Sequence, residues 1–131
     1  MKKGFHANIE DLTLQNTDFR HVLYTGEHSQ LVLMSLKPGE EIGMEAHETV
    51  DQFFRFELGT GKVIINKYEY LVSNGDVIIV PAGCKHNVVN TSTTTNLQLY
   101  TVYSPANHID GTVHKTKSDA TEEHFDGKTT E

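Results

Sequence analysis

The stretch GDVIIVPAGCKHNVVN, Gly75–Asn90, decides how this chain folds. It opens with a Gly-Asp turn and continues with four apolar residues, a pattern typical of a short buried strand. Pro81 and Gly83 then stiffen and bend the backbone, which indicates a tight turn. His86 begins the next β-forming run directly after that turn. The role of this histidine depends on which side chains from elsewhere in the chain meet it.

Short runs of β-forming residues, separated by turn residues, make up most of the rest of the chain. Helix signals are confined to the two ends, at Asn8–Leu14 with Asn8 as N-cap and at Ser118–His124. Many short strands with almost no helix between them predict an all-β sandwich or barrel. The expected strands are His21–Thr25, Ser29–Leu36, Gln52–Leu58, Lys62–Asn66, Tyr68–Val72, Val77–Pro81, His86–Asn90 and Asn96–Ser104.

Composition narrows the class of protein. With 131 residues, the chain has the length of one domain. The formal net charge is −7 and no run of Lys or Arg occurs, which argues against nucleic acid and anionic membrane as partners. No apolar run approaches the roughly 20 residues of a membrane helix, and Cys84 alone permits no internal disulfide. We expect a soluble, cytoplasmic protein with a small-molecule ligand.

Four polar residues are candidate metal ligands. Strand alternation turns Glu45 and His47 to one side, and it places Gln52 and His86 on faces that they share with apolar residues. Together they would supply two imidazoles and two side-chain oxygens, a set that suits zinc, iron, nickel or manganese. Spacing alone leaves the alternative that each histidine is an ordinary surface or hydrogen-bonded residue.

The chain resembles a small single-domain cupin. The second cupin motif, G-x5-P-x-G-x2-H-x3-N, matches at every defining position from Gly75 to Asn90. The first, G-x5-H-x-H-x(3,4)-E-x6-G, has the right spacing from Gly39 to Gly59. The resemblance implies a cupin jelly-roll β-barrel with short terminal helices and one divalent metal ion (Zn, Fe, Ni or Mn) inside. The implied ligands are Glu45, His47, Gln52 and His86.

The first motif departs from the family pattern at two ligand positions. Glu45 replaces the first histidine and Gln52 replaces the glutamate, so the set keeps two histidines and one carboxylate with the carboxylate moved. That charge pattern still suits a divalent cation. The alternative is that Glu45 turns outward and leaves a weak or empty site.

Further residues are assigned to the surroundings of the site. Phe54, Phe56 and Val88 share faces with candidate ligands, and we expect them to form the pocket wall. The loop after the last strand holds Tyr103, His108 and His114, which are the candidate acid or base groups. That loop has an alternative role as an arm packed outside the barrel or on a second subunit. No Arg or Lys is placed on the inner face.

We divide the chain into an N-terminal arm (1–19), a cupin barrel (20–104) and a C-terminal arm with an acidic, partly disordered tail (105–131). Exposed edge strands favour a homodimer, and the N-terminal segment Phe5–Phe19 and the C-terminal arm are apolar enough to cross onto the partner. We interpret the protein as a metal-dependent enzyme of isomerase or lyase type that acts on a sugar or organic acid by Lewis-acid catalysis. A non-catalytic module that binds or senses a sugar-like ligand and a non-haem iron dioxygenase remain alternatives.

Overall fold

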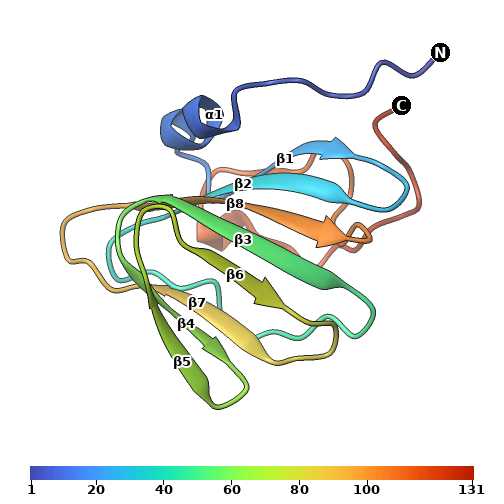
Figure 1. Ribbon diagram of the computed structural model, residues 1–131. Coiled ribbons are helices and arrows are strands. Elements are labelled where there is room, and N and C mark those ends of the chain that lie inside the picture. Colours follow the sequence, from blue (N-terminus) through green and yellow to red (C-terminus); the bar gives the residue numbers. More distant parts are fainter.

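The computed structural model describes residues 1–131 as two antiparallel sheets that face each other (Figure 1). The larger sheet has the strand order β6-β3-β8-β2-β1-β9, and the smaller has the order β5-β4-β7. This confirms the predicted all-β barrel with little helix. The elements are α1 (Ile9–Gln15), β1 (Arg20–Thr25), β2 (Gln30–Leu36), β3 (Asp51–Leu58), β4 (Gly61–Ile65), β5 (Tyr68–Val72), β6 (Val77–Val80), β7 (His86–Asn90), β8 (Leu97–Ser104), β9 (Val113–His114) and the 3₁₀-helix η1 (Lys117–Asp119).

The core fills the space between the two sheets. In β3 every second residue is buried, so that Phe54 and Phe56 point inward from the same face as Gln52. Val63 of β4 and Val88 of β7 meet them from the smaller sheet, and all four apolar side chains are fully buried. Because Gln52 and His86 lie on these inward faces, the barrel interior carries polar groups at one end of an apolar core.

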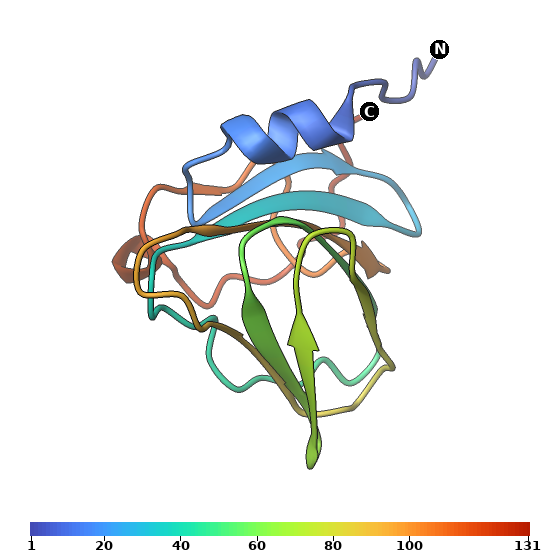
Figure 2. The same cartoon turned by 60° about the vertical axis from the view of Figure 1, so that its left-hand side comes forward.

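Helix α1 covers the outer face of the larger sheet, opposite the smaller sheet (Figure 2). The expected N-cap is confirmed, because the side chain of Asn8 accepts a hydrogen bond from the backbone N–H of Asp11 at 3.0 Å. The amide of Gln98 in β8 holds the end of the helix by donating to the carbonyl groups of Thr13, Leu14 and Asn16. One buried glutamine thus joins the N-terminal segment to the central strand of the sheet.

The prediction of a second helix at Ser118–His124 is wrong, apart from a single turn. Only Lys117–Asp119 is helical, as a 3₁₀ turn, and Ala120 is already extended with φ −64° and ψ 132°. The Asp119 carboxylate accepts hydrogen bonds from the backbone N–H and the hydroxyl of Thr116, which closes this short turn. The residues after it run as an irregular arm.

The C-terminal segment lies along β1. Strand β9 was not expected from the sequence; it pairs His114 with Arg20 and Val113 with His21. Farther on, the backbone N–H of Thr130 donates to the carbonyl of Thr25 at 2.9 Å. Both chain ends lie on the same side of the barrel (Figure 1). No helix is long and apolar enough to span a lipid bilayer.

Candidate metal site

Glu45 and His86 face each other across an isolated antiparallel bridge. Each backbone N–H donates to the carbonyl of the other residue, and both hydrogen bonds measure 2.9 Å. Ile42 extends the pairing, because its N–H donates to the carbonyl of Val88. Directly opposed residues of an antiparallel pair project their side chains to the same face. The backbone therefore turns Glu45 toward His86, and the alternative that Glu45 points away from the site is excluded.

His47 is positioned by the turn that precedes His86. Its carbonyl accepts a hydrogen bond from the N–H of Gly83 at 2.8 Å. Gly83 has φ +84°, a conformation that a residue with a Cβ adopts only with strain. The glycine of the second motif thus joins the turn to the histidine of the first motif.

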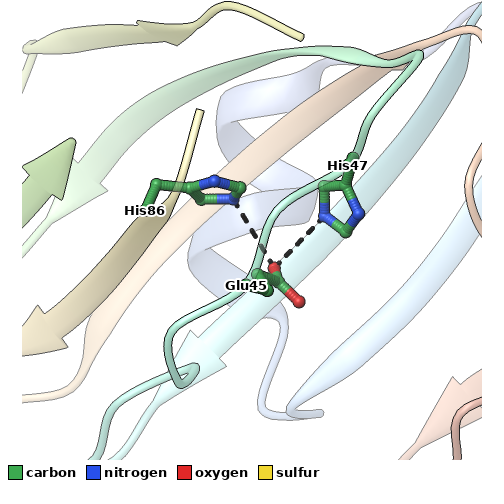
Figure 3. Close-up of side chains that lie close together, drawn as sticks. All are labelled: Glu45, His47 and His86. Carbon is green, nitrogen blue, oxygen red and sulfur yellow. Dashed lines mark ion pairs between the residues drawn. The ribbon is translucent and has the colours of Figure 1, made fainter. Parts of the chain in front are cut away.

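The ligand atoms of the three residues converge on one point (Figure 3). Glu45 Oε1 lies 3.4 Å from His47 Nε2 and 3.7 Å from His86 Nε2. The two imidazole rings are tilted by 59°, with their centroids 5.4 Å apart. Two ligands bound to a tetrahedral zinc ion at about 2.1 Å lie about 3.4 Å from each other. The separations found here match that spacing.

A backbone carbonyl fixes the orientation of His86. Its Nδ1 lies 3.0 Å from the carbonyl oxygen of Cys84, which can only accept a hydrogen bond. Nδ1 therefore carries the proton in the neutral ring, and Nε2 presents its lone pair to Glu45 and His47. Cys84 itself is partly buried against the core, so its contribution to the site comes from its backbone.

Three buried polar atoms of the candidate ligands have no hydrogen-bond partner. They are His47 Nε2, His86 Nε2 and Gln52 Oε1. The other end of the Gln52 amide donates to Thr101 Oγ1 at 3.0 Å, which assigns its oxygen to the free position. Buried polar atoms without partners are rare and costly in folded proteins. Two imidazoles, a carboxylate and an amide oxygen with free lone pairs fit a divalent cation.

Charge interactions reinforce the cluster. Burial opposes ionisation of Glu45, but the two imidazoles more than offset this effect and hold the pKa of the carboxyl at about 2. For His86, burial lowers the pKa, whereas the Glu45 carboxylate and the Cys84 carbonyl raise it, and the net shift is upward. Glu45 is therefore a carboxylate throughout the neutral range.

A cavity of about 460 Å³ opens beside Glu45 and His47. Its size is that of a site for a small molecule. One wall comes from the start of the barrel and another from the irregular arm after β9. The lining residues are Phe19, Arg20, Ile42, Glu45, Ala46, His47, Asn107, His108, Lys117, Ala120, Thr121, Glu122, Glu123 and His124.

Two of the three acid or base candidates, Tyr103 and His108, form a pair next to the candidate metal ligands. The Tyr103 hydroxyl lies 3.1 Å from His108 Nε2, and the Tyr103 ring lies edge-on to His47 with centroids 5.8 Å apart. Burial raises the pKa of Tyr103, although Arg20 opposes the shift. Burial lowers the pKa of His108 to about 3, and Arg20 acts in the same direction. Both side chains are neutral near pH 7. His114 instead contacts Arg20 and does not line the cavity.

The expected pocket-wall residues lie behind the metal cluster. Phe54 lies edge-on to His86 with ring centroids 6.3 Å apart, whereas Phe56 and Val88 belong to the buried core. None of the three lines the open cavity, because side chains of this size complete the interior of the barrel and the cavity lies on the other side of the ligands. These three side chains therefore support the candidate metal ligands from within the core.

Arg20 is the residue that sequence reasoning missed. We expected no basic side chain on the inner face, but Arg20 is 6% exposed and lines the cavity. A signal was present, because Arg20 precedes Val22 by two residues and shares its inward face. The expected strand began one residue later, at His21, so this alternation was not extended to Arg20.

Comparisons with known proteins agree with the fold and with the motifs. The cupin-domain family model matches residues 32–103, more than half of the chain. The chain is 49% identical over 124 residues to the protein YrkC of Bacillus subtilis (strain 168), a match that covers 90% of this chain and 66% of YrkC, so the chain spans just under two thirds of that relative.

Two solved structures are similar. The crystal structure of BH2720 from Bacillus halodurans superposes with a TM-score of 0.87 at 43% identity, covering 89% of this chain and 92% of that one. A Thermotoga maritima protein described as a predicted oxalate decarboxylase has a TM-score of 0.57 at 26% identity, covering 60% of this chain and 68% of that one. With its two-sheet barrel and both motifs in place, this chain belongs to the cupin-domain family.

Proposed function

We propose that this protein is a metal-dependent enzyme of isomerase or lyase type that acts on a small polar metabolite. The observation that carries the proposal is the convergence of Glu45, His47 and His86 beside the cavity, with both histidine Nε2 atoms free of hydrogen bonds. Gln52 is the fourth ligand in this proposal, through the amide oxygen that has no partner. The donor set suits zinc, iron, nickel or manganese.

A divalent ion bound here supplies Lewis-acid polarisation of a carbonyl or enolate oxygen. The chain itself contributes orientation and exclusion of water. The Cys84 carbonyl holds the His86 ring, and Thr101 holds the Gln52 amide. Tyr103 and His108 keep one proton between the phenol oxygen and Nε2, and His108 lines the cavity. They are the groups placed to give a proton to a bound metabolite or to take one from it.

The similarity to the Thermotoga maritima protein described as a predicted oxalate decarboxylase supports the lyase class. The non-catalytic alternative also has support from one observation. An effective general acid or base has a pKa near the working pH. Tyr103 is shifted upward and His108 is shifted down to about 3, so neither is tuned to neutral pH in the free protein. A binding or sensing module needs no such tuning.

The decisive experiment begins with protein purified without chelator. We expect close to one equivalent of divalent metal per chain by elemental analysis. Metal-free protein should then bind zinc, nickel, manganese or anaerobic ferrous iron at a single site. A screen of sugars and organic acids on the metal-loaded protein, read by turnover and by thermal shift, separates the two functions. Thermal shift without turnover would favour the binding module, and absence of any metal binding would refute the proposed function.

A further inference from the structure

Arg20 is a buried cation without an anionic partner. Its side chain is 6% exposed, and none of the ion pairs of the structure includes it. One guanidinium nitrogen lies 3.2 Å from His114 Nδ1, and Nε has no hydrogen-bond partner. A guanidinium carries five N–H donors and remains charged at any working pH. Burying such a charge unpaired is costly, which points to a partner that the chain does not supply.

The groups around Arg20 leave its charge uncompensated. His114 can only accept from Arg20, so it bears its own proton on Nε2 and is neutral. Burial, and then the charge of Arg20, lower the pKa values of both His114 and His108. The Phe19 ring lies below the guanidinium, 5.2 Å from its central carbon, and supports it without neutralising it.

Arg20 lines the same cavity as two of the candidate metal ligands. Glu45 and His47 line the same space of about 460 Å³. The acidic residues of the cavity wall on the arm, Glu122 and Glu123, are solvent-exposed and form no ion pair with Arg20. A molecule in this cavity therefore meets both the candidate metal ligands Glu45 and His47 and a buried positive charge.

We propose that Arg20 binds the carboxylate of a small organic acid whose second oxygen function, a carbonyl or hydroxyl group, faces Glu45 and His47. This inference rests on the proposed function, because it names the substrate class of the same site. The planar guanidinium matches the two oxygens of a carboxylate and binds them with two parallel hydrogen bonds. A phosphate group is served better by several cations or backbone N–H groups, and Arg20 is the single buried cation of the cavity wall.

The test uses glycolate, its neutral amide glycolamide and inorganic phosphate as probes, with affinities measured by NMR titration on zinc-loaded and zinc-free protein. The parent protein should bind glycolate and bind glycolamide at least about tenfold more weakly. Arg20→Met should weaken glycolate binding by about 10- to 100-fold, the range expected for a hydrogen-bonded charge. Arg20→Lys keeps the charge and loses the planar fork, so its affinity should fall between the two.

Lys67→Met is the control. Lys67 is exposed, lies in the turn between β4 and β5 and does not line the cavity, so its loss should change glycolate affinity by less than about twofold. Equal affinity of Arg20→Met and parent for glycolate would overturn the inference, and so would equal affinity of the parent for glycolate and glycolamide. Arg20-dependent binding of phosphate that is tighter than that of glycolate would overturn the carboxylate assignment in favour of a phosphorylated ligand.

Two measurements keep this inference separate from the metal proposal. Arg20-dependent glycolate binding in a protein that binds no zinc would support the Arg20 subsite and refute the metal site. Zinc binding together with a glycolate affinity that is unchanged in Arg20→Met would support the metal site and refute the Arg20 subsite. Thermal denaturation adds an independent readout: removing an unpaired buried charge should leave the Tm of Arg20→Met equal or higher. A lower Tm with unchanged glycolate affinity would identify Arg20 as structural and overturn the inference.

Discussion

The Nδ1 atom of His86 lies 3.0 Å from the backbone carbonyl oxygen of Cys84, two residues earlier in the chain. The turn thus fixes which nitrogen of His86 faces the barrel interior. We predict that neutral His86 is the Nδ1–H tautomer, and that ¹⁵N chemical shifts of the metal-free protein at pH 8 show a protonated Nδ1 and an unprotonated Nε2. A spectrum with the proton on Nε2 would contradict this geometry.

Both histidines should be indispensable for metal binding. His47→Ala and His86→Ala each remove one of the three converging donors. The loss of affinity should exceed the roughly 10- to 100-fold that loss of an outer-shell partner costs. His28→Ala is the matched control, because its side chain is 94% exposed and takes no part in the cluster. Competition titration with a chromophoric chelator measures all three variants, and parent-like affinity in His47→Ala and His86→Ala would refute the site.

Gln52→Glu should tighten metal binding. A second carboxylate adds attraction for the cation, and at this depth an extra unit charge is worth about tenfold or more in affinity. The Thr101 hydroxyl, which now accepts from Gln52, can rotate and donate to the new carboxylate. Gln52→Leu, which keeps the bulk and removes the oxygen, should weaken binding. Measured by isothermal titration calorimetry, the metal affinity should decrease in the order Glu, Gln, Leu at position 52. A reversed order would show that residue 52 is not a ligand.

Metal affinity should fall as the pH is lowered. Protons and metal compete for the imidazoles, and His86 has a raised pKa, so the loss begins above the ordinary histidine value of about 6.5. Glu45, with a pKa of about 2, stays ionised and adds nothing to the slope above pH 4. Where two protons must be displaced for each metal ion bound, the affinity should drop by up to about a hundredfold per pH unit. Zinc titrations from pH 8 to pH 5 measure the slope, with circular dichroism as the check that the fold persists.

Asn90 closes the second motif and has a structural role. Its Nδ2 lies within 3.1 Å of the carbonyl oxygens of Leu36, Lys37 and Thr95, and its Oδ1 accepts from the N–H of Ser92.

Asn90→Ala should lower the free energy of unfolding by about 3 kcal/mol and the Tm by about 10 °C, because it leaves buried carbonyl groups without donors. Asn96→Ala is the control, since Asn96 is exposed. A Tm of Asn90→Ala within about 2 °C of the parent Tm would contradict the assigned role.

The homodimer remains a prediction. Both β5 and β6 are edge strands, and they expose apolar side chains, of which Leu71 is 83% and Ile79 63% exposed. The N-terminal arm packs on its own barrel, with Phe5 against Tyr24, so we place the contact at a sheet edge. Light scattering at micromolar concentration should give twice the chain mass of 14.7 kDa, and the mass of a single chain would contradict it.

The sequence predicted the local structure well where a pattern is short-range. All eight expected strands are present, because alternation of apolar residues and the Gly and Pro turns specify them within a few residues. Glu45, His47 and His86 do meet, as the resemblance to the cupin motifs implied. Whether Glu45 faces inward was left open, since its orientation depends on a bridge to a residue 41 positions later in the chain.

What the sequence did not reveal depends on long-range packing. Strand β9 has only two residues, too few for any period to be recognised, and it forms because β1 offers a free edge. Arg20 was read as lying outside the first strand. Alternation from Val22 assigns Arg20 to an inward face, but burial of a charged residue contradicts its ordinary preference, and the cavity is completed by an arm about 100 residues later.

The cluster of candidate ligands and most of the cavity wall come from different parts of the chain. The segment shared with the cupin-domain family, residues 32–103, contains Glu45, His47 and His86. Most of the cavity lining comes from the flanks, including Arg20 before the segment and His108 after it. Mutations at the chain ends can therefore reshape the cavity while the cluster of Glu45, His47 and His86 stays intact. Exchange of these ends between relatives offers a direct route to proteins of this family with an altered cavity and an unchanged set of candidate ligands.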